Sequence, residues 1–161
     1  MPFVQPYNMR HPGFTITSAA PNPVLAETEL SCYGRAFTTK PTQEINKYTT
    51  FCGKFSTAGT PEWEITFKVY QSFGTDGLWT VLYPLCGYVV DFTHQPDETA
   101  VISVDNPLMT GQCRVPYFSF LEGEEGQPSE FDLVFPVEGT PTFSTTPPTA
   151  LAADQAETVD A

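Results

Sequence analysis

Residues 62–73 read EWEITFKVYQSF, and this stretch decides the fold class. Apolar and polar side chains alternate along it, broken only at Gln71, with the period of a β-strand, whose successive side chains point to opposite faces. We therefore expect a strand with one face in a hydrophobic core. The apolar set is Trp63, Ile65, Phe67, Val69 and Phe73. The outward set is Glu62, Glu64, Thr66, Lys68 and Tyr70.

Further short strands are expected on both sides of this one, separated by Gly and Pro turns. Candidates before it lie within residues 26–40 and in residues 44–55, where a strand ends at Gly53. After it, YVVDFTH (88–94) and TAVISVD (99–105) predict a hairpin. RVPYFSFL (114–121) is another candidate strand, and FDLVFPV (131–137) places Phe131, Leu133, Phe135 and Val137 on one face. Pro136 marks that last stretch as an edge strand or a strand end.

One short helix interrupts the strands. The turn-forming residues GTDG are followed by LWTVLYPLCG, in which Leu78, Trp79, Leu82 and Leu85 have helical spacing. We expect about two helical turns that end near Pro84 and Gly87.

Composition supports an all-β domain. The chain has 161 residues, enough for one domain with its own core, and contains 16 prolines, 13 Phe, 7 Tyr and 2 Trp. These residues suit pleated surfaces and loops better than helix interiors. We predict a β-sandwich or partly closed barrel over residues 25–146, with one short flanking helix.

The two ends of the chain read differently from this domain. Residues 1–24 hold five prolines and no sustained periodicity, which predicts an extended arm. Its aromatic residues Phe3, Tyr7 and Phe14 are candidate anchors for pockets on another surface, and the alternative is a disordered leader. Residues 147–161 have no aromatic residue and predict a low-complexity tail. No stretch has the apolar length of a signal peptide or a membrane span, so we expect a soluble protein made in a cytoplasm.

The four cysteines are Cys32, Cys52, Cys86 and Cys113. They form no CxxC pair and have no nearby histidines, which disfavours a zinc site. A domain of this size does not need disulfides, so buried free thiols are expected, with a disulfide framework as the alternative.

Charge is unevenly distributed. The net charge is -12, but residues 1–61 carry five basic and three acidic side chains, whereas residues 62–161 carry two basic and sixteen acidic ones. Binding to nucleic acid requires Lys and Arg to neutralise phosphates, so the acidic body argues against it.

Residues suited to catalysis are sparse. The two histidines are His11 and His94, and Asp91 precedes His94 by three residues along a predicted strand, which puts the two on opposite faces. Sequence signatures of common hydrolases, nucleotide-binding loops and metalloproteases are absent. The acidic stretch EGEEG (122–126) lacks the alternating ligands of a calcium loop, and no carboxylate pair stands out for glycoside hydrolysis. We therefore predict no catalytic, cofactor-binding or metal-binding residue, and no enzyme.

The stretch from about Phe51 to Phe143 resembles the major tail proteins of long-tailed bacteriophages that infect actinobacteria. The residues that carry the resemblance are EWEITFKVYQSF, the following GTDGLWTVLYPLCGYVVDFTHQP, then SVDNP, an acidic Gly-rich loop and the closing FDLVFPVEGTPTFS. The resemblance implies a β-sandwich with a flanking helix, assembled as hexameric rings that stack head to tail into a tube through which the genome passes.

This resemblance implies a function for the outward residues of the strand. The outward residues Glu62 to Tyr70 would line the lumen of a virion tail tube, where an acidic wall lets DNA pass without binding. The mildly basic N-terminal region of one subunit would dock on the acidic body of its neighbour. Partners would be further copies and other tail or head proteins, assembled in the cytoplasm of a host bacterium. A capsid decoration protein, or another head or tail component of similar fold, is the first alternative, and a small β-sandwich binding module or carbohydrate-active enzyme is the second.

Overall fold

The structure is a computed structural model that describes residues 9, 11–119, 121 and 123–147. Its strands within these residues are β1 (Gly13–Ser18), β2 (Leu25–Glu29), β3 (Gly34–Thr42), β4 (Ile45–Thr50), β5 (Gly53–Ala58), β6 (Glu62–Tyr70), β7 (Val89–Gln95), β8 (Leu108–Arg114) and β9 (Glu130–Ser144). Its helical segments are α1 (Leu78–Leu82) and two 3-10 turns, Ser31–Tyr33 and Tyr83–Leu85.

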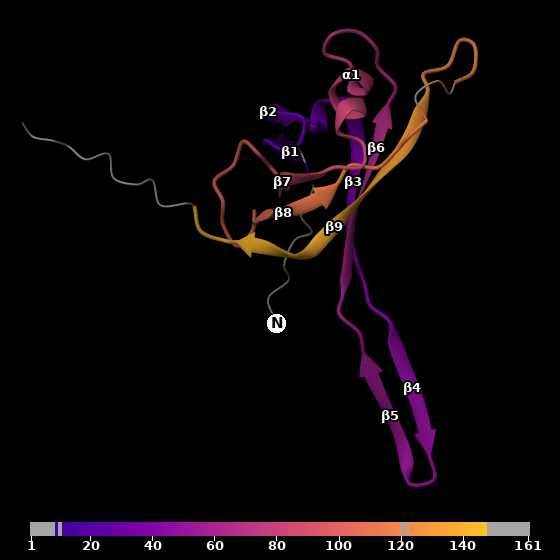
Figure 1. Cartoon of the computed structure of the whole chain (residues 1–161). Coiled ribbons are helices and arrows are strands. Elements are labelled where there is room, and N and C mark those ends of the chain that lie inside the picture. The colour runs from indigo at the N-terminus through magenta and orange to yellow at the C-terminus, as the bar shows by residue number, and fades with distance from the viewer. Residues whose placement is uncertain (1–8, 10, 120, 122, 148–161) are drawn as a thin grey trace, which may run out of the picture.

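Seven of these strands form one antiparallel sheet in the order β2-β1-β7-β8-β9-β6-β3. The sheet has two open edges, β2 and β3, so it does not close into a barrel. Strands β4 and β5 form a separate hairpin that projects from the body (Figure 1). The all-β prediction is thereby confirmed.

Strand β9 links the two halves of the sheet. Its first half pairs with β6 as far as Pro136, which lies opposite Glu64, and from Val137 onward it pairs with β8. Just beyond this point Gln112 lies opposite Glu138 and Thr110 opposite Thr142, so β9 has two extra residues there, and such bulges strengthen local twist. The prediction of an edge strand or strand end at Pro136 is wrong: the proline lies inside a long central strand, where that strand changes neighbours.

The sheet curls around an aromatic core. Phe14 of β1 and Phe37 of β3 lie five positions apart in the strand order, yet their ring centroids are 5.3 Å apart. Phe14 also meets the rings of Phe67 and Phe135 edge-on. Full burial of each such ring contributes roughly 1.5–3 kcal/mol. These contacts hold the two halves of the sheet face to face.

The predicted extended arm over residues 1–24 is therefore only partly an arm. Gly13–Ser18 is a central strand, paired with β7 on one side and β2 on the other, and Phe14 is fully buried. Phe14 is a core residue of its own domain and not an anchor on another surface. Its strand, GFTITS, is too short for the alternation to stand out. Phe3 and Tyr7 lie outside the described residues, as do residues 148–161 of the predicted tail.

The strand predicted from EWEITFKVYQSF is confirmed as β6. Ile65, Phe67 and Val69 are fully buried, and Trp63 is partly buried. The strand ends at Tyr70, and one further backbone bond, from the Gln71 amide to the Ser129 carbonyl, extends its pairing before the loop 71–77 begins to turn. Phe73 is consequently 58% exposed, so its assignment to the core was wrong.

The short helix is also confirmed. Leu78, Leu82 and Leu85 are buried against the core, and the Ser72 hydroxyl accepts a hydrogen bond from the Leu78 amide at 2.9 Å. No helix in the described part of the chain is long and apolar enough to cross a membrane.

The hairpin predicted from residues 88–94 and 99–105 is wrong in its second strand. β7 pairs with β8, and residues 96–107 form a loop in which Val101 is 74% exposed. Buried Asn106 organises this loop by donating hydrogen bonds to the carbonyls of Asp97 and Ala100. The candidate strand at 114–121 is likewise absent beyond Arg114 in the residues that the structure describes.

Residues 44–55, predicted as one strand, are a hairpin whose turn lies at Phe51 and Cys52. The β3–β6 pair continues into the β4–β5 pair through two connecting segments of unequal length. Three residues, 59–61, lie between β5 and β6, whereas two, 43 and 44, lie between β3 and β4. The Gly59 amide donates to the Glu44 carbonyl across this junction.

Candidate functional site: a polar sheet face and a projecting hairpin

The outward residues of β6 lie together on one face of the sheet, as their alternation requires. Glu62 and Tyr70 are exposed, and Glu64, Thr66 and Lys68 are half-buried. The neighbouring strand β9 places Glu130 opposite Tyr70 and Asp132 opposite Lys68. We call this surface the polar face; it consists of Arg35, Lys40, Glu62, Glu64, Thr66, Lys68, Tyr70, Glu130 and Asp132.

A chain of ion pairs crosses one end of the polar face. The Lys68 ammonium lies 3.1 Å from the Asp132 carboxylate and 3.5 Å from that of Glu130, which is itself 2.8 Å from the Arg35 guanidinium. Hydrogen bonding and charge attraction raise the pKa of Lys68, mainly through Asp132. The Arg35 hydrogen bond lowers the pKa of the Glu130 carboxyl. Exposed pairs of this kind contribute little to stability each, but they fix the charges of the face.

These pairs change the expected electrostatics of the polar face. It carries four carboxylates, Glu62, Glu64, Glu130 and Asp132, against the three cations Arg35, Lys40 and Lys68. It is close to neutral at the end nearer Tyr70, and its unpaired acidic groups gather near the hairpin. The assignment of these residues to a lumen stays a prediction.

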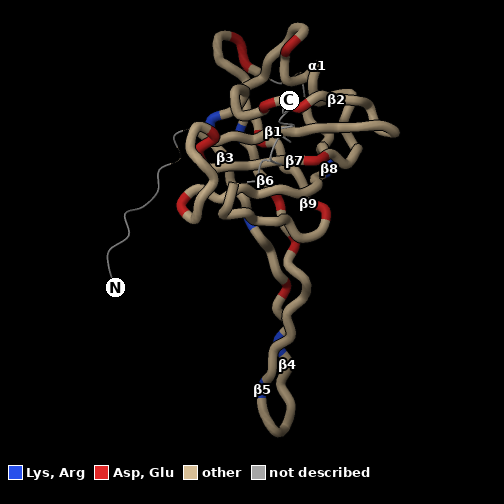
Figure 2. The backbone as a smooth tube through the Cα atoms, turned by 90° about the vertical axis from the view of Figure 1, so that its left-hand side faces the viewer, with Lys and Arg blue, Asp and Glu red and all other residues tan. Residues whose placement is uncertain are grey.

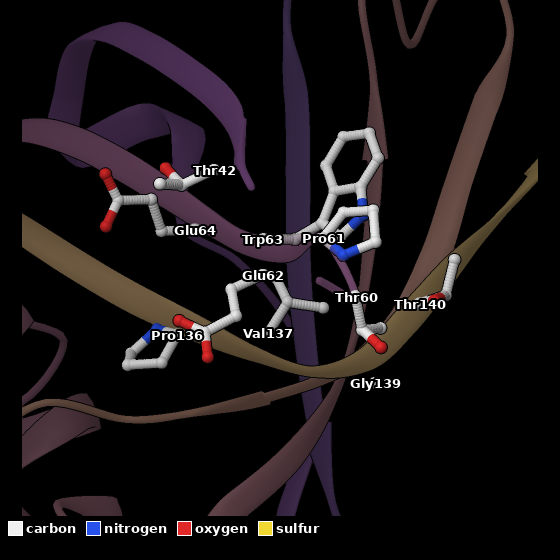
Figure 3. Close-up of a pocket in the computed structure, with 10 residues that line it drawn as sticks. All are labelled: Thr42, Thr60, Pro61, Glu62, Trp63, Glu64, Pro136, Val137, Gly139 and Thr140. Atoms are coloured by element: carbon white, nitrogen blue, oxygen red, sulfur yellow. The ribbon is translucent and has the colours of Figure 1, made fainter. Parts of the chain in front are cut away.

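An open cleft of about 550 Å³ lies beside the paired strands β6 and β9, at the root of the hairpin (Figure 3). Glu62, Trp63 and Pro136 are among its lining residues. The indole of Trp63 packs on Phe143, with 5.7 Å between centroids, so it offers no exposed stacking platform. None of the described lining residues is a histidine, cysteine, lysine or arginine.

The β4–β5 hairpin is the most exposed structure in the described chain. Every residue of both strands is solvent-exposed, and the hairpin extends away from the body in both views (Figures 1 and 2). Tyr48 lies opposite Phe55 on one face of it. Lys47, Lys54 and Ile45 lie on the other face, and Phe51 occupies the tip fully exposed.

The two ends of the body differ in charge. Strands β4 and β5 carry two lysines and no acidic residue. At the opposite end lie two loops, residues 71–77 and the described residues 121 and 123–129, which contribute Asp76, Glu124 and Glu125 (Figures 1 and 2). We call these two loops the acidic end. Phe73 is exposed there, beside the helix.

The histidine and cysteine positions do not form a reactive site. His94 is buried, with its Nδ1 atom 2.9 Å from the Gly13 carbonyl oxygen, and burial lowers its pKa. Asp91 is exposed on the other face of β7, where it accepts a hydrogen bond from Gln112. No group of three metal-ligating side chains exists among the described residues.

All four cysteines are free thiols, as predicted, but only two are buried. Burial raises the pKa of Cys113 to about 12 and also raises that of Cys86. Cys32 and Cys52 are exposed, so the expectation of burial is wrong for them. Cys52 lies in the hairpin turn, and the signal for that turn was the glycine that follows it.

No protein-family model matches this sequence, and no curated protein matches it significantly.

Proposed function

We propose that this protein is a bacteriophage virion structural protein, a tail tube subunit that assembles into rings stacked head to tail. The observation that carries the proposal is the exposed β4–β5 hairpin. The resemblance of residues 51–143 to major tail proteins supports the same role.

The hairpin has the properties of a segment that is covered after assembly. An isolated two-stranded hairpin is marginally stable in water, because neither face has a core to pack on. Here the exposed apolar side chains Tyr48, Phe51 and Phe55 sit on such a hairpin, where Tyr48 stacks on Phe55. Burying them against a partner would supply the missing packing.

The partner that fits the hairpin is a second copy of the chain. The hairpin is basic, and the acidic end lies on the opposite side of the same molecule. A contact between two different surfaces of one protein is heterologous, and it propagates into a ring or filament. Head-to-tail stacking would bring Lys47 and Lys54 of one subunit close to Glu124 and Glu125 of the next.

The sheet offers the second contact that a tube requires. Both edge strands, β2 and β3, have unpaired backbone groups, and such edges pair readily with other chains. Lateral contacts through these edges would close a ring, in which the polar face is our proposed lumen surface. Its ion pairs leave few free cations there, so DNA would pass without specific binding. The natural partners would be further copies and other tail or head proteins of the virion, assembled in the cytoplasm of a host bacterium.

Negative-stain electron microscopy of the purified protein, concentrated at several salt concentrations, tests this proposal. We expect rings or tubes of uniform diameter with a central hole. A variant in which Tyr48, Phe51 and Phe55 are all replaced by Ser should stay unassembled while keeping its circular dichroism spectrum. Monomers or trimers that bind empty phage heads would overturn the tube and favour the decoration protein. Monomers that form no rings and bind no phage heads would overturn both virion roles.

A further inference from the structure

Three segments that are distant in sequence converge on Gly13, at the start of β1. The end of β2 lies near it through the Thr15–Glu29 pairing, and Glu98 of the loop 96–107 lies against it. A Cβ atom built on Gly13 would lie 2.9 Å from the Cβ of Glu98, closer than such atoms approach. Glycine therefore lets the Glu98 side chain rest directly on the β1 backbone.

The loop is fastened at this point by its backbone. The Glu98 amide donates to the His11 carbonyl at 2.9 Å, and Asp97 forms a parallel bridge with His11. Asn106 accepts a hydrogen bond from the Asp97 amide at 3.0 Å. Glu98 is thus held in place from both sides of the loop.

Glu29, the last residue of β2, faces Glu98 across this junction. Burial, a hydrogen bond with the Glu98 side chain and the negative charge of Glu98 all raise the pKa of the Glu29 carboxyl. The Oε1 atom of Glu29 is buried and has no donor among the described residues. A buried acceptor without a donor is costly, and the adjacent group is itself a carboxyl. One proton between the two would satisfy both, as in paired carboxyls elsewhere.

The charged groups nearby do not stabilise the pair when both carboxyls are ionised. Glu27 on the same strand adds a further negative charge, and the Phe14 amide is the one group that favours the charged form. Asp97 is occupied by the Thr99 amide and hydroxyl, and Arg35, which lines the same cleft as Glu98, pairs with Glu130. His11 and Cys32 also line that cleft, and His94 lies on the far side of Gly13, bonded to its carbonyl. β1 itself contributes no titratable side chain.

We propose that Glu29 and Glu98 form a proton-sharing latch that fastens the loop 96–107 to the edge of the sheet, and that loss of the shared proton releases it. Two charged carboxylates in contact would repel each other. The loop and the end of β2 would then separate at Gly13, beside the buried side chains of Phe14 and Leu30. This device is independent of the proposed tail tube role, since every residue in it belongs to one copy of the chain.

The direction of the pH response follows from the environment of Glu29. Burial and the neighbouring Glu98 raise the pKa of Glu29 from 4.5 to about 7. A raised carboxyl pKa means that the latch is fully closed below pH 4.5 and is lost as pH rises through about 7. Above that pH the loop should open more often than below it.

Hydrogen exchange of the full chain, followed by mass spectrometry or NMR, tests the latch. The readouts are the Glu98 amide, bonded to the His11 carbonyl, and the Leu30 amide, bonded to the Phe14 carbonyl. After correction for the intrinsic rate, we expect their protection to fall about tenfold between pH 5 and pH 8.5. The Asp91 amide, inside the sheet, serves as the internal reference.

Two variants separate the latch from simple stability. Glu29→Gln supplies a permanent donor to Glu98, so protection at these two amides should become independent of pH, whatever its absolute level. Glu27→Gln removes one charge from the same strand without touching the pair, so the fall should persist. The latch is refuted if Glu29→Gln keeps the same pH dependence as the unmodified protein, or if the unmodified protein shows none.

Discussion

Tyr48 stacks on Phe55 across the β4–β5 hairpin, with 5.1 Å between ring centroids, while the two residues remain 47% and 52% exposed. An aromatic pair of this kind contributes about 0.5–1.5 kcal/mol beyond the burial of its area. It stiffens a hairpin that has no core of its own. The pair also presents an exposed apolar surface on one face of the hairpin.

The hairpin tip provides a clean mutational test, because it makes no contact with the core. Phe51→Ser should prevent assembly at concentrations where the unmodified protein forms rings or tubes, as measured by sedimentation velocity. The free energy of unfolding should change by less than about 0.5 kcal/mol. Tyr117→Ser removes an exposed aromatic residue from the body and should leave assembly intact. Equal loss of assembly in both variants would argue against the hairpin.

Charge reversal tests which surface accepts the hairpin. Lys47→Glu with Lys54→Glu should abolish assembly, because the hairpin would then repel the acidic end of the next copy. The double reversal Glu124→Lys with Glu125→Lys should also abolish assembly on its own. Mixing the two reversed proteins should restore association in alternating order, because each hairpin again meets an end of opposite charge, and native mass spectrometry should detect mixed oligomers. Restoration should weaken as salt rises from 0.05 to about 0.5 M, owing to screening. Failure of the mixture to associate would place the acceptor elsewhere.

Phe14 distinguishes a core residue from an arm anchor. Because its ring is fully buried among four other rings of the sheet and His94, Phe14→Ala should cost about 3–5 kcal/mol of unfolding free energy. Urea denaturation at pH 7 measures this in the unassembled protein. A loss below 1 kcal/mol would contradict the placement of β1 in the sheet.

The sequence predicts a strand or helix correctly where its periodicity extends over several turns or alternations. β6 has an uninterrupted alternation from Trp63 to Val69, and the leucines of the helix have clear spacing, so both were predicted. GFTITS has only three inward positions and follows several prolines, so local signals favoured an arm. Its place in the sheet depends on pairing with β7, about 80 residues away, and such pairing leaves no local trace.

The candidate site, too, was predictable only where local pattern determines it. Alternation identified the outward residues of β6, yet the partners that balance their charge, Glu130 and Asp132, come from β9 through the register of two strands. The hairpin was missed because Ile45, Phe51 and Phe55 fall on the same side of the alternation in residues 44–55, which also suits a single half-buried strand. Its separation from the body depends on the extra residue at 59–61.

Acid should weaken the ion pairs of the polar face. The pKa of Glu130 is lowered by Arg35 and Lys68, so its contribution to stability is present above pH 4.5 and is lost as pH falls through its folded-state value. This sign is opposite to that of Glu29. We expect Lys68→Met to reduce the fall in Tm between pH 5 and pH 3, whereas Lys54→Met on the hairpin should not. An identical fall in both variants would show that the network has no effect.

Alkylation of Cys52 tests the central claim most directly. Cys52 is exposed in the hairpin turn, so a thiol reagent reaches it in the unassembled protein. The measurement is the ratio of its alkylation rate in sedimented assemblies to its rate in free subunits, by mass spectrometry. We predict that assembly slows Cys52 at least about tenfold, because the hairpin is then covered by the next copy. An unchanged rate in assembled protein would contradict hairpin-mediated stacking.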